Sequence, residues 1–435
     1  SSQSTLPERR PPEPRHNPLP GRLRERLRER LGERLREREP EALRPPRKGR
    51  GARANPTGRF ERRRVEPDLD ALAELPAPSL PESGRGNGNG NRNGNGEDGP
   101  DASERRGLAD EDVSDFGGDA GGGATQTIPD PSRSALVFNQ SPDIPFDASL
   151  NPYRGCEHGC AYCYARPTHE YLGYSAGLDF ETKILVKERA PELLRRELAA
   201  PRWTPQVVAL SGVTDAYQPI ERRLELTRRC VEVFVAFRNP ITVITKNALV
   251  VRDIDLFRQL AEVDAVSVAL SLTTLDGSLA RVLEPRASAP HERLRAIERL
   301  AEAGIPTTVM VAPVIPGLTD AELPALLSAA ASAGATRAGK IVLRLPHGLR
   351  ELFDDWLATH RPLRRQKVRH RLESLRGGRL NDPRFGHRLR GEGRFAEQIS
   401  GLFDLMARRH GLDEPHPPLS TAAFRRPGGT QLPLL

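Results

Sequence analysis

The segment ITVITKNALVVRDIDLFRQLAEVDAVSVALSL (Ile241–Leu272) contains two strand-like runs with a helical pattern between them. The runs ITVITKN (Ile241–Asn247) and AVSVALSL (Ala265–Leu272) are short, apolar and rich in β-branched residues, as buried strands are. The stretch Ile254–Glu262 between them is amphipathic with the period of a helix. Because a helical crossover joins parallel strands, the segment predicts a parallel strand–helix–strand unit.

The same alternation continues on both sides of this segment. Further apolar, β-branched runs occur at Gln206–Gly212, Pro306–Ile315 and Lys340–Leu345, and helical patterns occur at Ile220–Phe237, Pro290–Ala303 and Asp320–Ala333. Strands of this kind, separated by helices of roughly 10–15 residues, predict an α/β fold in which helices cover a parallel sheet. Such units form a full or partial β/α barrel or a doubly wound sheet. Both place functional residues at the carboxyl ends of the strands.

Charge divides the chain of 435 residues into three regions. The whole chain has 66 Lys and Arg against 58 Asp and Glu, a net charge of +8, with 37% hydrophobic and 5% aromatic residues. Residues 1–66 hold 20 basic and 10 acidic residues, residues 67–130 hold 4 and 14, and residues 131–435 hold 42 and 34. The charges of the first two regions cancel, and their polar composition predicts a disordered, low-complexity extension over residues 1–130.

That extension contains one repeat and two low-complexity tracts. The repeat GRLRERLRERLGERLRERE (Gly21–Glu39) has a leucine at every fourth residue, which predicts a single charge-stabilised helix, with a partner-docking helix or a nucleic-acid arm as the alternative. The tracts Arg85–Gly99 and Gly117–Ala124 are polar or glycine-rich and predict no packed structure. Because the chain has no run of 18 apolar residues and no apolar stretch near its start, we expect a cytoplasmic protein without a membrane span or signal peptide.

Three of the four cysteines lie in the stretch NPYRGCEHGCAYCYARP (Asn151–Pro167). Cys156, Cys160 and Cys163 have the spacing C-x3-C-x2-C, and Tyr162 directly precedes the last of them. Three thiolates on one loop can hold three corners of a cubane iron–sulfur cluster and leave one iron open to a small molecule. A zinc site is the alternative, and it would need His158 or Cys230 as a fourth ligand. Cys230 itself is most simply a core residue on an amphipathic helix.

This motif is similar to the signature of radical S-adenosylmethionine (SAM) enzymes. The longer string GCEHGCAYCYA (Gly155–Ala165) further resembles the spore photoproduct lyase-like branch, also called DNA repair photolyase-like, and the similarity extends from Ser134 to Ala407. The resemblance implies a partial (β/α)6 barrel as the radical SAM core over residues 131–350, followed by a basic helical segment over residues 351–435 that packs on the core. It also implies a [4Fe–4S] cluster on Cys156, Cys160 and Cys163 that reductively cleaves SAM to a 5′-deoxyadenosyl radical, with an electron donor such as a flavodoxin or ferredoxin.

The resemblance also implies roles for residues near the ends of four successive strands. It places Ser211, Gly212, Thr214 and Asp215 near the SAM amino group, Lys246 near the SAM carboxylate, Ser271 near the ribose, and the backbone from Val314 to Gly317 near the adenine, with Tyr162 packing nearby. Polar residues at strand ends are also common as helix N-caps, which is the alternative for each of them. No residue is assigned to catalysis.

The substrate prediction depends on an arginine-rich segment. From Arg361 to Arg394 the chain holds 12 Arg and Lys against three acidic residues. Dense arginine with interleaved glycine and with Phe385 and Phe395 is typical of contact with a phosphate backbone. We therefore expect nucleic acid to bind through Arg361–Arg394, with another large acidic substrate next. A solvated surface helix is the structural alternative.

One observation restricts the analogy with spore photoproduct lyases. Those enzymes use a cysteine after the second strand as hydrogen donor, but SGVTD (211–215) contains none, and Tyr217 is the alternative donor. Glu284 and Arg286 either lie over the barrel mouth or form a loop ion pair.

Three functions compete for this sequence. The first is a radical SAM enzyme that repairs or modifies nucleic acid. The second is one that acts on a peptide or small metabolite, and the third is a non-enzymatic zinc-binding nucleic-acid module.

Overall fold

The computed structural model describes residues 49–56, 58–60, 124–414 and 417–427. The chain divides into two compact units, Ser1–Arg59 with Gly121–Leu435 and Phe60–Ala120. Apart from Phe60, every described residue belongs to the first unit. The predicted helix Gly21–Glu39, the tract Arg85–Gly99 and all but the last residue of the tract Gly117–Ala124 lie outside the described residues.

A seven-stranded sheet forms the centre of the first unit, in the order β10-β9-β8-β7-β6-β3-β2. Its parallel strands are β3 (Ala148–Leu150), β6 (Val208–Leu210), β7 (Ile241–Thr245), β8 (Val266–Ser271), β9 (Thr307–Val314) and β10 (Arg337–Val342), and only β2 (Leu136–Phe138) runs antiparallel to its neighbour. Six parallel strands in an open sheet confirm the predicted α/β fold with the arrangement of a partial (β/α)6 barrel.

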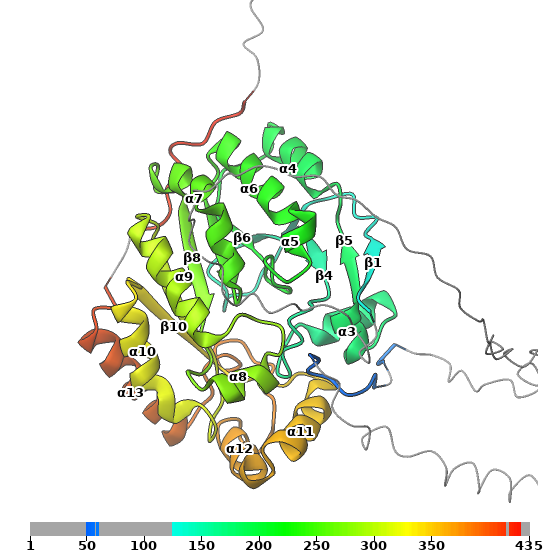
Figure 1. Ribbon diagram of the computed structural model, residues 1–435, viewed down its shortest axis with the longest axis vertical. Helices are drawn as coiled ribbons and strands as arrows, with labels where there is room; N and C mark the ends of the chain where they lie inside the picture. Colours follow the sequence, from blue (N-terminus) through cyan, green and yellow to red (C-terminus); the bar gives the residue numbers. More distant parts are fainter. Residues whose placement is uncertain (1–48, 57, 61–123, 415–416, 428–435) are drawn as a thin grey trace, which may run out of the picture. The chain divides into compact units, whose positions relative to one another are not determined.

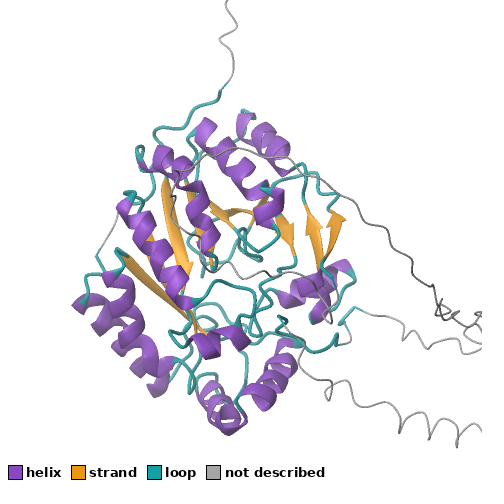
Figure 2. Ribbon diagram, viewed as in Figure 1, coloured by secondary structure: helices purple, strands orange, loops and turns teal. Residues whose placement is uncertain are grey.

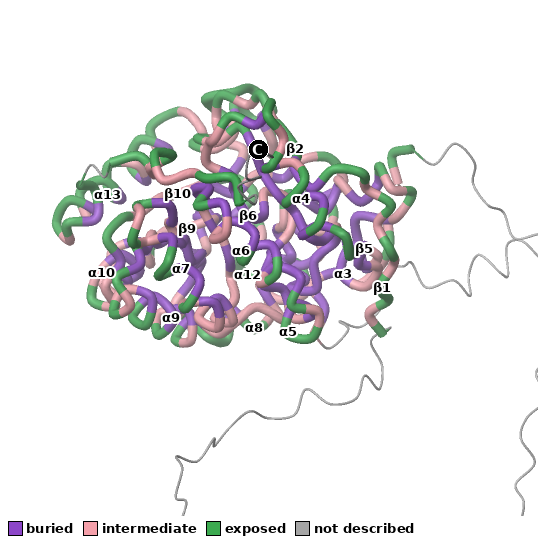
Figure 3. The backbone as a smooth tube through the Cα atoms, turned by 90° about the horizontal axis from the view of Figure 1, so that it is seen from above, coloured by how far each residue is buried: buried purple, intermediate pink, exposed green. Residues whose placement is uncertain are grey.

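Helices cover the sheet because each carries one apolar side (Figures 1 and 2). They are α4 (Ala190–Ala199), α6 (Leu226–Phe237), α7 (Ile254–Ala261), α9 (Pro290–Glu302), α10 (Leu323–Ser332) and α13 (Arg394–Arg409). Their buried side chains form one hydrophobic core with the strands, and Figure 3 shows these buried residues in the interior. No helix in the described part of the chain is long and apolar enough to cross a membrane.

Two further groups of elements hold the cysteine stretch. A three-stranded sheet has the order β1-β5-β4, with β1 at Gln126–Pro129, β4 at Tyr153–Arg154 and β5 at Lys183–Val186. The elements η2 (Arg166–Leu172) and α3 (Leu178–Thr182) lie between β4 and β5 in sequence. On the other side, α8 (Gly277–Leu283), α11 (Leu349–His360) and α12 (Pro362–Ser374) contribute a second hydrophobic cluster that includes Cys160, Ala161 and Tyr162.

Several predicted element boundaries need correction. The predicted helix Ile220–Phe237 is two helices, α5 (Glu221–Leu224) and α6, because Glu225 between them has a left-handed backbone with φ 48°. The strand predicted at Lys340–Leu345 begins three residues earlier, at Arg337, and ends at Val342. Short turns of helix, η3 (Ala248–Asp253) and η4 (Asp320–Glu322), precede α7 and α10.

The described residues 49–56, 58–60 and 126–129 correct the prediction that all of residues 1–130 are disordered. The Ala54 carbonyl accepts a hydrogen bond from Leu178 N (3.3 Å), and the Pro56 carbonyl accepts one from Ser175 Oγ (2.7 Å). Strand β1 pairs along its length with β5. These short pieces dock through backbone hydrogen bonds and through polar side chains, such as Arg53, which lies 3.3 Å from the Asp355 carboxylate. Neither kind of contact needs apolar side chains, so the average composition of the region did not reveal them.

Candidate functional site

The cysteine loop (residues 155–164) follows β4 directly, and hydrogen bonds hold its backbone in place. Gly155 has φ 82°, and a Cβ there would lie 3.0 Å from two backbone carbonyl oxygens, so the turn into the loop requires glycine. The loop backbone donates to three separate parts of the core: Cys156 N to the Phe180 carbonyl (2.9 Å), Glu157 N to Gln218 Oε1 (2.8 Å) and Ala161 N to the Leu283 carbonyl (3.0 Å).

A buried ion pair between Arg166 and Glu181 stabilises the cysteine loop. Arg166 and Glu181 are 1% and 0% exposed, and their charged groups lie 2.5 Å apart. Arg166 also donates to the carbonyl oxygens of Gly159 (3.1 Å) and Cys160 (3.0 Å), so it fixes the middle of the cysteine loop. Removal of either partner would leave an uncompensated buried charge, which costs about 3–5 kcal/mol.

The N-terminal segment 49–56 completes this support. Both oxygens of Glu181 accept backbone hydrogen bonds from it, from Gly51 N (3.1 Å) and Ala52 N (2.8 Å). A Cβ on Gly51 would lie 1.7 Å from the Gly159 carbonyl oxygen, so the two backbones touch. The segment therefore packs directly on the cysteine loop. Gly51 itself is the one feature of the sequence that indicates this close approach of two backbones.

The three thiols of the loop suit an iron–sulfur cluster. Cys156 and Cys160 are buried and Cys163 is half-buried, and none forms a disulfide. Burial raises the pKa of the Cys156 and Cys160 thiols, and negative neighbours raise it further, including Asp215 for Cys156 and Glu284 for Cys160. Bound iron would reverse this by favouring the thiolate. Cys160 and Cys163 also influence the pKa of Cys156, so the thiols lie within electrostatic range of one another.

The alternative zinc site receives no support from its proposed fourth ligands. His158 contacts Asp215 and Asn247 instead, and Cys230 is 0% exposed within the main core. Among the described residues, no three His, Cys, Asp or Glu side chains form the ligand set of a single metal ion. A cubane cluster does not need such a set, because each thiolate binds a different iron. The residues present therefore fit an iron–sulfur cluster better than a zinc ion. Cys230 lies in the main hydrophobic core, as the sequence predicts.

Asp215 is fully engaged by protein groups. Its Oδ1 accepts hydrogen bonds from Thr245 Oγ1 (2.7 Å) and Tyr217 N (2.9 Å), and its Oδ2 accepts one from Lys246 N (2.7 Å) and lies 3.3 Å from His158 Nδ1. Burial opposes its ionisation, but His158 and these hydrogen bonds outweigh burial and lower the pKa of Asp215 to about 2. Asp215 thus links the cysteine loop to the ends of β6 and β7, and its expected contact with the SAM amino group stays a prediction.

The backbone turns sharply after β6, and the side chain of Asn151 stabilises this turn. Its Oδ1 accepts hydrogen bonds from Gly212 N (2.9 Å) and Val213 N (3.1 Å), while Ser211 has a left-handed backbone with φ 66°. The Ser211 hydroxyl donates to the Ile244 carbonyl (3.1 Å), and the Thr214 hydroxyl to the Tyr153 carbonyl (3.2 Å). Ser211 and Thr214 thus shape the turn through their side chains.

Tyr162 belongs to a buried polar network. Its hydroxyl contacts Thr273 Oγ1 (3.2 Å) and donates to Glu284 Oε1, and the other Glu284 oxygen pairs with Arg293. Burial opposes the charge of Glu284, but Arg293 and Lys246 outweigh it and lower the pKa of Glu284 to about 2. Glu284 therefore forms a buried ion pair and does not lie over the barrel mouth. Tyr162 is an anchor of the loop.

The remaining predicted cofactor residues lie on neighbouring strands. The Lys246 ammonium is 3.4 Å from the Ala312 carbonyl and 5.8 Å from the centre of the Tyr162 ring. Ser271 is buried, and its carbonyl accepts from Arg293 Nη1 (2.9 Å). The Val314 carbonyl accepts from Leu343 N (2.9 Å), so this group is already used within the sheet.

Tyr217, the alternative hydrogen donor, lies in the core. It is 0% exposed, and its hydroxyl donates to Asp253 Oδ2 (3.0 Å). Burial and Asp253 raise the pKa of Tyr217 well above its ordinary value. These contacts correct the suggestion that Tyr217 faces the site. Sequence reasoning also missed Asn151, Arg166, Glu181 and Arg293, whose polar side chains bind backbone groups outside their own helix or strand.

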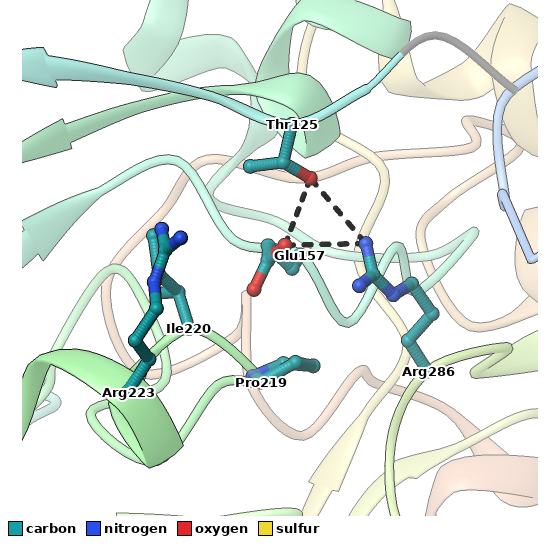
Figure 4. A pocket seen from close by; sticks show the side chains of 6 residues that line it. All are labelled: Thr125, Glu157, Pro219, Ile220, Arg223 and Arg286. Atoms are coloured by element: carbon teal, nitrogen blue, oxygen red, sulfur yellow. Dashed lines mark hydrogen bonds and ion pairs between the residues drawn. The ribbon is translucent and has the colours of Figure 1, made fainter. Parts of the chain in front are cut away.

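A hollow of about 190 Å³ lies beside the cysteine loop (Figure 4). Glu157, which directly follows Cys156, points into it, and Glu157 Oε1 contacts Thr125 Oγ1 (2.8 Å) and Arg286 Nη1 (3.2 Å). Glu157 is 4% exposed, and its second oxygen has no hydrogen-bond partner among the described residues. The exposed Arg223 lies across the hollow.

Comparison with known proteins identifies the class. Residues 150–330 match the family model of the Radical SAM superfamily. Over 297 residues the chain is 38% identical to the uncharacterized protein Rv2578c of Mycobacterium tuberculosis. The aligned region covers 67% of this chain and 84% of that protein. The chain is also 32% identical over 173 residues to the uncharacterized protein MJ0683 of Methanocaldococcus jannaschii, covering 40% of this chain and 62% of that protein. The chain belongs to the radical SAM superfamily.

Membership confirms the superfamily predicted from the cysteine motif. Enzymes of this superfamily use a [4Fe–4S] cluster and SAM and need a reductant, so this chain is a radical SAM enzyme with those cofactors. The structure of spore photoproduct lyase complexed with dinucleoside spore photoproduct is also similar, at 16% identity and a TM-score of 0.47, covering 65% of this chain and 79% of that chain.

Proposed function

We propose that Cys156, Cys160 and Cys163 hold the cluster and that SAM binds beside it at the carboxyl ends of β6 to β9. When bound, the reduced cluster supplies the electron that cleaves SAM to a 5′-deoxyadenosyl radical. Support comes from three buried or half-buried thiols on one loop whose backbone is hydrogen-bonded on several sides. The cluster of apolar side chains around Cys160 and Tyr162 keeps water from that side of the loop.

Among the predicted SAM contacts, Lys246 is the one we favour most. Its ammonium has a single long hydrogen bond to a carbonyl, whereas the carboxylate of Asp215 is used by four protein groups. A lysine in this position can bind a carboxylate. Gly212, Thr214, Ser271 and Val314 then line the remainder of the SAM site.

Anaerobic reconstitution with iron and sulfide, followed by dithionite and SAM, tests this assignment. Wild-type protein should bind about four iron atoms per chain and release 5′-deoxyadenosine. Cys160→Ala should lose both properties. Cys230→Ala is the matched control, because that thiol is buried in the core, and it should retain both. Cluster formation and SAM cleavage by Cys160→Ala at the wild-type level would contradict the assignment.

We propose that the substrate is nucleic acid, which the enzyme repairs or modifies. The observation that carries this proposal is a row of exposed cations on α12, Arg364, Lys367 and Arg371, spaced three and four residues apart. None of them forms an ion pair within the described residues, whereas Arg365, Arg369, Arg384 and Arg388 of the predicted basic segment pair with Asp354, Glu373, Asp382 and Asp143. The unpaired row presents positive charge on one helical face, as contact with phosphates requires.

A salt series measures this contact. Affinity for a DNA or RNA oligonucleotide should fall steeply with salt, and Arg364→Gln/Lys367→Gln/Arg371→Gln should reduce the slope of log K against log salt by about 2–3. Arg195→Gln/Arg258→Gln/Arg299→Gln is the matched control, since these exposed arginines lie on α4, α7 and α9. If wild-type affinity does not change with salt, phosphate binding is excluded, and a peptide or small metabolite becomes the leading substrate class.

We infer that the reductant is an acidic electron-carrier protein, such as a flavodoxin or ferredoxin, and that it docks at the hollow beside Glu157. Glu157, the residue that directly follows Cys156, lines the hollow, so a carrier docked there would lie close to the cysteine loop (Figure 4). Arg222 and Arg223 are exposed and form no ion pair among the described residues, so they can meet an acidic surface.

A further inference from the structure

Aromatic rings and guanidinium groups alternate along the surface that leads away from the cysteine loop. Tyr164 follows Cys163, is 43% exposed, and is held at the end of β6 by a hydrogen bond from its hydroxyl to the Gly212 carbonyl. The Arg344 guanidinium lies 4.5 Å from the centre of the Tyr164 ring. Further out, the Arg388 guanidinium lies 4.6 Å from the centre of the Phe385 ring, which is 56% exposed.

These two pairs form one row, which we call the stacking row (Tyr164, Arg344, Arg388 and Phe385). Val342 N donates a hydrogen bond to the Leu389 carbonyl (2.9 Å), and Arg376 donates to the carbonyl oxygens of both Leu343 (2.6 Å) and Arg388 (3.2 Å). The backbones that carry Arg344 and Arg388 therefore lie side by side. The row thus begins at the residue next to Cys163 and ends in the loop between α12 and α13.

Asp143 holds the outer end of the stacking row in place. Its carboxylate accepts hydrogen bonds from Arg388 Nε (2.5 Å) and Gly386 N (2.7 Å). Arg388 also donates to Ser141 Oγ (2.5 Å), and its carbonyl accepts from Arg376 Nη1 (3.2 Å). Arg388 and the backbone next to Phe385 are therefore fixed, while much of the Phe385 ring remains exposed.

Exposed rings beside guanidinium planes suit the faces of nucleobases, which stack on both. A base inside a duplex cannot offer its face, so only an unpaired or extruded base can use such a surface. We propose that the stacking row binds an unpaired nucleobase of the substrate and leads it toward the cysteine loop. This inference rests on nucleic acid being the substrate, and it adds that the base is recognised outside the duplex.

Binding of three probes tests the stacking row in the full-length protein: a single-stranded oligonucleotide containing 2-aminopurine, an abasic oligonucleotide of the same length, and the matching duplex. We expect the wild-type protein to bind the base-bearing single strand most tightly and to change its fluorescence. Phe385→Ala should weaken that binding about tenfold without changing its salt dependence, since the phosphate contacts remain. Phe385→Trp should retain the affinity.

Leu405→Ala is the control, because Leu405 is 58% exposed on α13 and should not affect binding. Equal affinity for the base-bearing and abasic strands, or unchanged binding by Phe385→Ala, would overturn the stacking row alone. Salt-independent or undetectable binding of every probe would overturn the proposed substrate class and this inference together.

Discussion

The His158 imidazole lies 3.3 Å from the carboxylate of Asp215, and this contact joins the cysteine loop to the sheet. Asp215 in turn binds Thr245 and the backbone of Lys246 at the end of β7. The second ring nitrogen of His158 lies 3.3 Å from Asn247 Nδ2. His158, the middle one of the three residues between the first two cysteines, is thus held by the same strand end that carries Lys246. The loop and the proposed SAM site are therefore positioned together.

Replacement of Asp215 should loosen the cysteine loop. Asp215→Ala leaves buried donors without an acceptor, and we expect it to lower the free energy of unfolding by about 2–4 kcal/mol and to reduce iron bound on reconstitution. Iron content and urea unfolding measure the two effects. Asp255→Ala is the control, since that carboxylate is 56% exposed. A normal iron content in Asp215→Ala would show that the contact does not position the loop.

The Glu284–Arg293 pair should make stability depend on acid. The pKa of Glu284 is about 2 in the folded protein, against an ordinary value of 4.5, so the unfolded chain binds the proton more readily. Its contribution of about 3 kcal/mol is present above pH 4.5 and is lost as pH falls toward 2. When pH is lowered from 7 to 3, the free energy of unfolding of Glu284→Gln, measured with urea, should therefore fall by about 2 kcal/mol less than that of wild type. Glu292→Gln is the control, because that side chain is 40% exposed, and it should behave as wild type.

The contact between Gly51 and Gly159 should not tolerate a side chain at residue 51. Gly51→Ala would place a Cβ against a backbone carbonyl and displace the segment 49–56 from Glu181. We expect trypsin to cleave after Arg50 and Arg53 about tenfold faster, because local opening exposes both sites. Gly348→Ala is the control, since nothing lies within 4 Å of a Cβ there. Equal cleavage of the two variants would contradict the packing role.

The sequence predicted the elements that depend on local pattern and missed the contacts that depend on distant residues. Alternating apolar runs located β6 to β9 within a few residues, and cysteine spacing identified the superfamily. Strand β3 was not predicted, because its three residues lie in a stretch interrupted by Pro142, Pro145 and Pro152, in which no apolar β-branched run is visible. The carboxylate of Asp215 was predicted as a ligand contact, yet its partners are supplied by the cysteine loop and β7, which only folding brings together. A polar residue near a strand end can bind a ligand or hydrogen-bond to other protein groups, and its neighbours in the folded protein decide between these two roles.

Electron delivery should depend on the charge beside Glu157. Arg222→Glu/Arg223→Glu should slow 5′-deoxyadenosine formation about tenfold or more when a reduced flavodoxin or ferredoxin supplies electrons at low salt, because like charges then meet at the docking surface. With dithionite, a small reductant that needs no docking surface, the variant should match wild type. Arg195→Glu/Arg258→Glu is the charge-matched control from α4 and α7, and it should respond normally to both reductants. A variant that is slow with dithionite as well would indicate damage to the cluster site, and one that is normal with the carrier would place docking elsewhere.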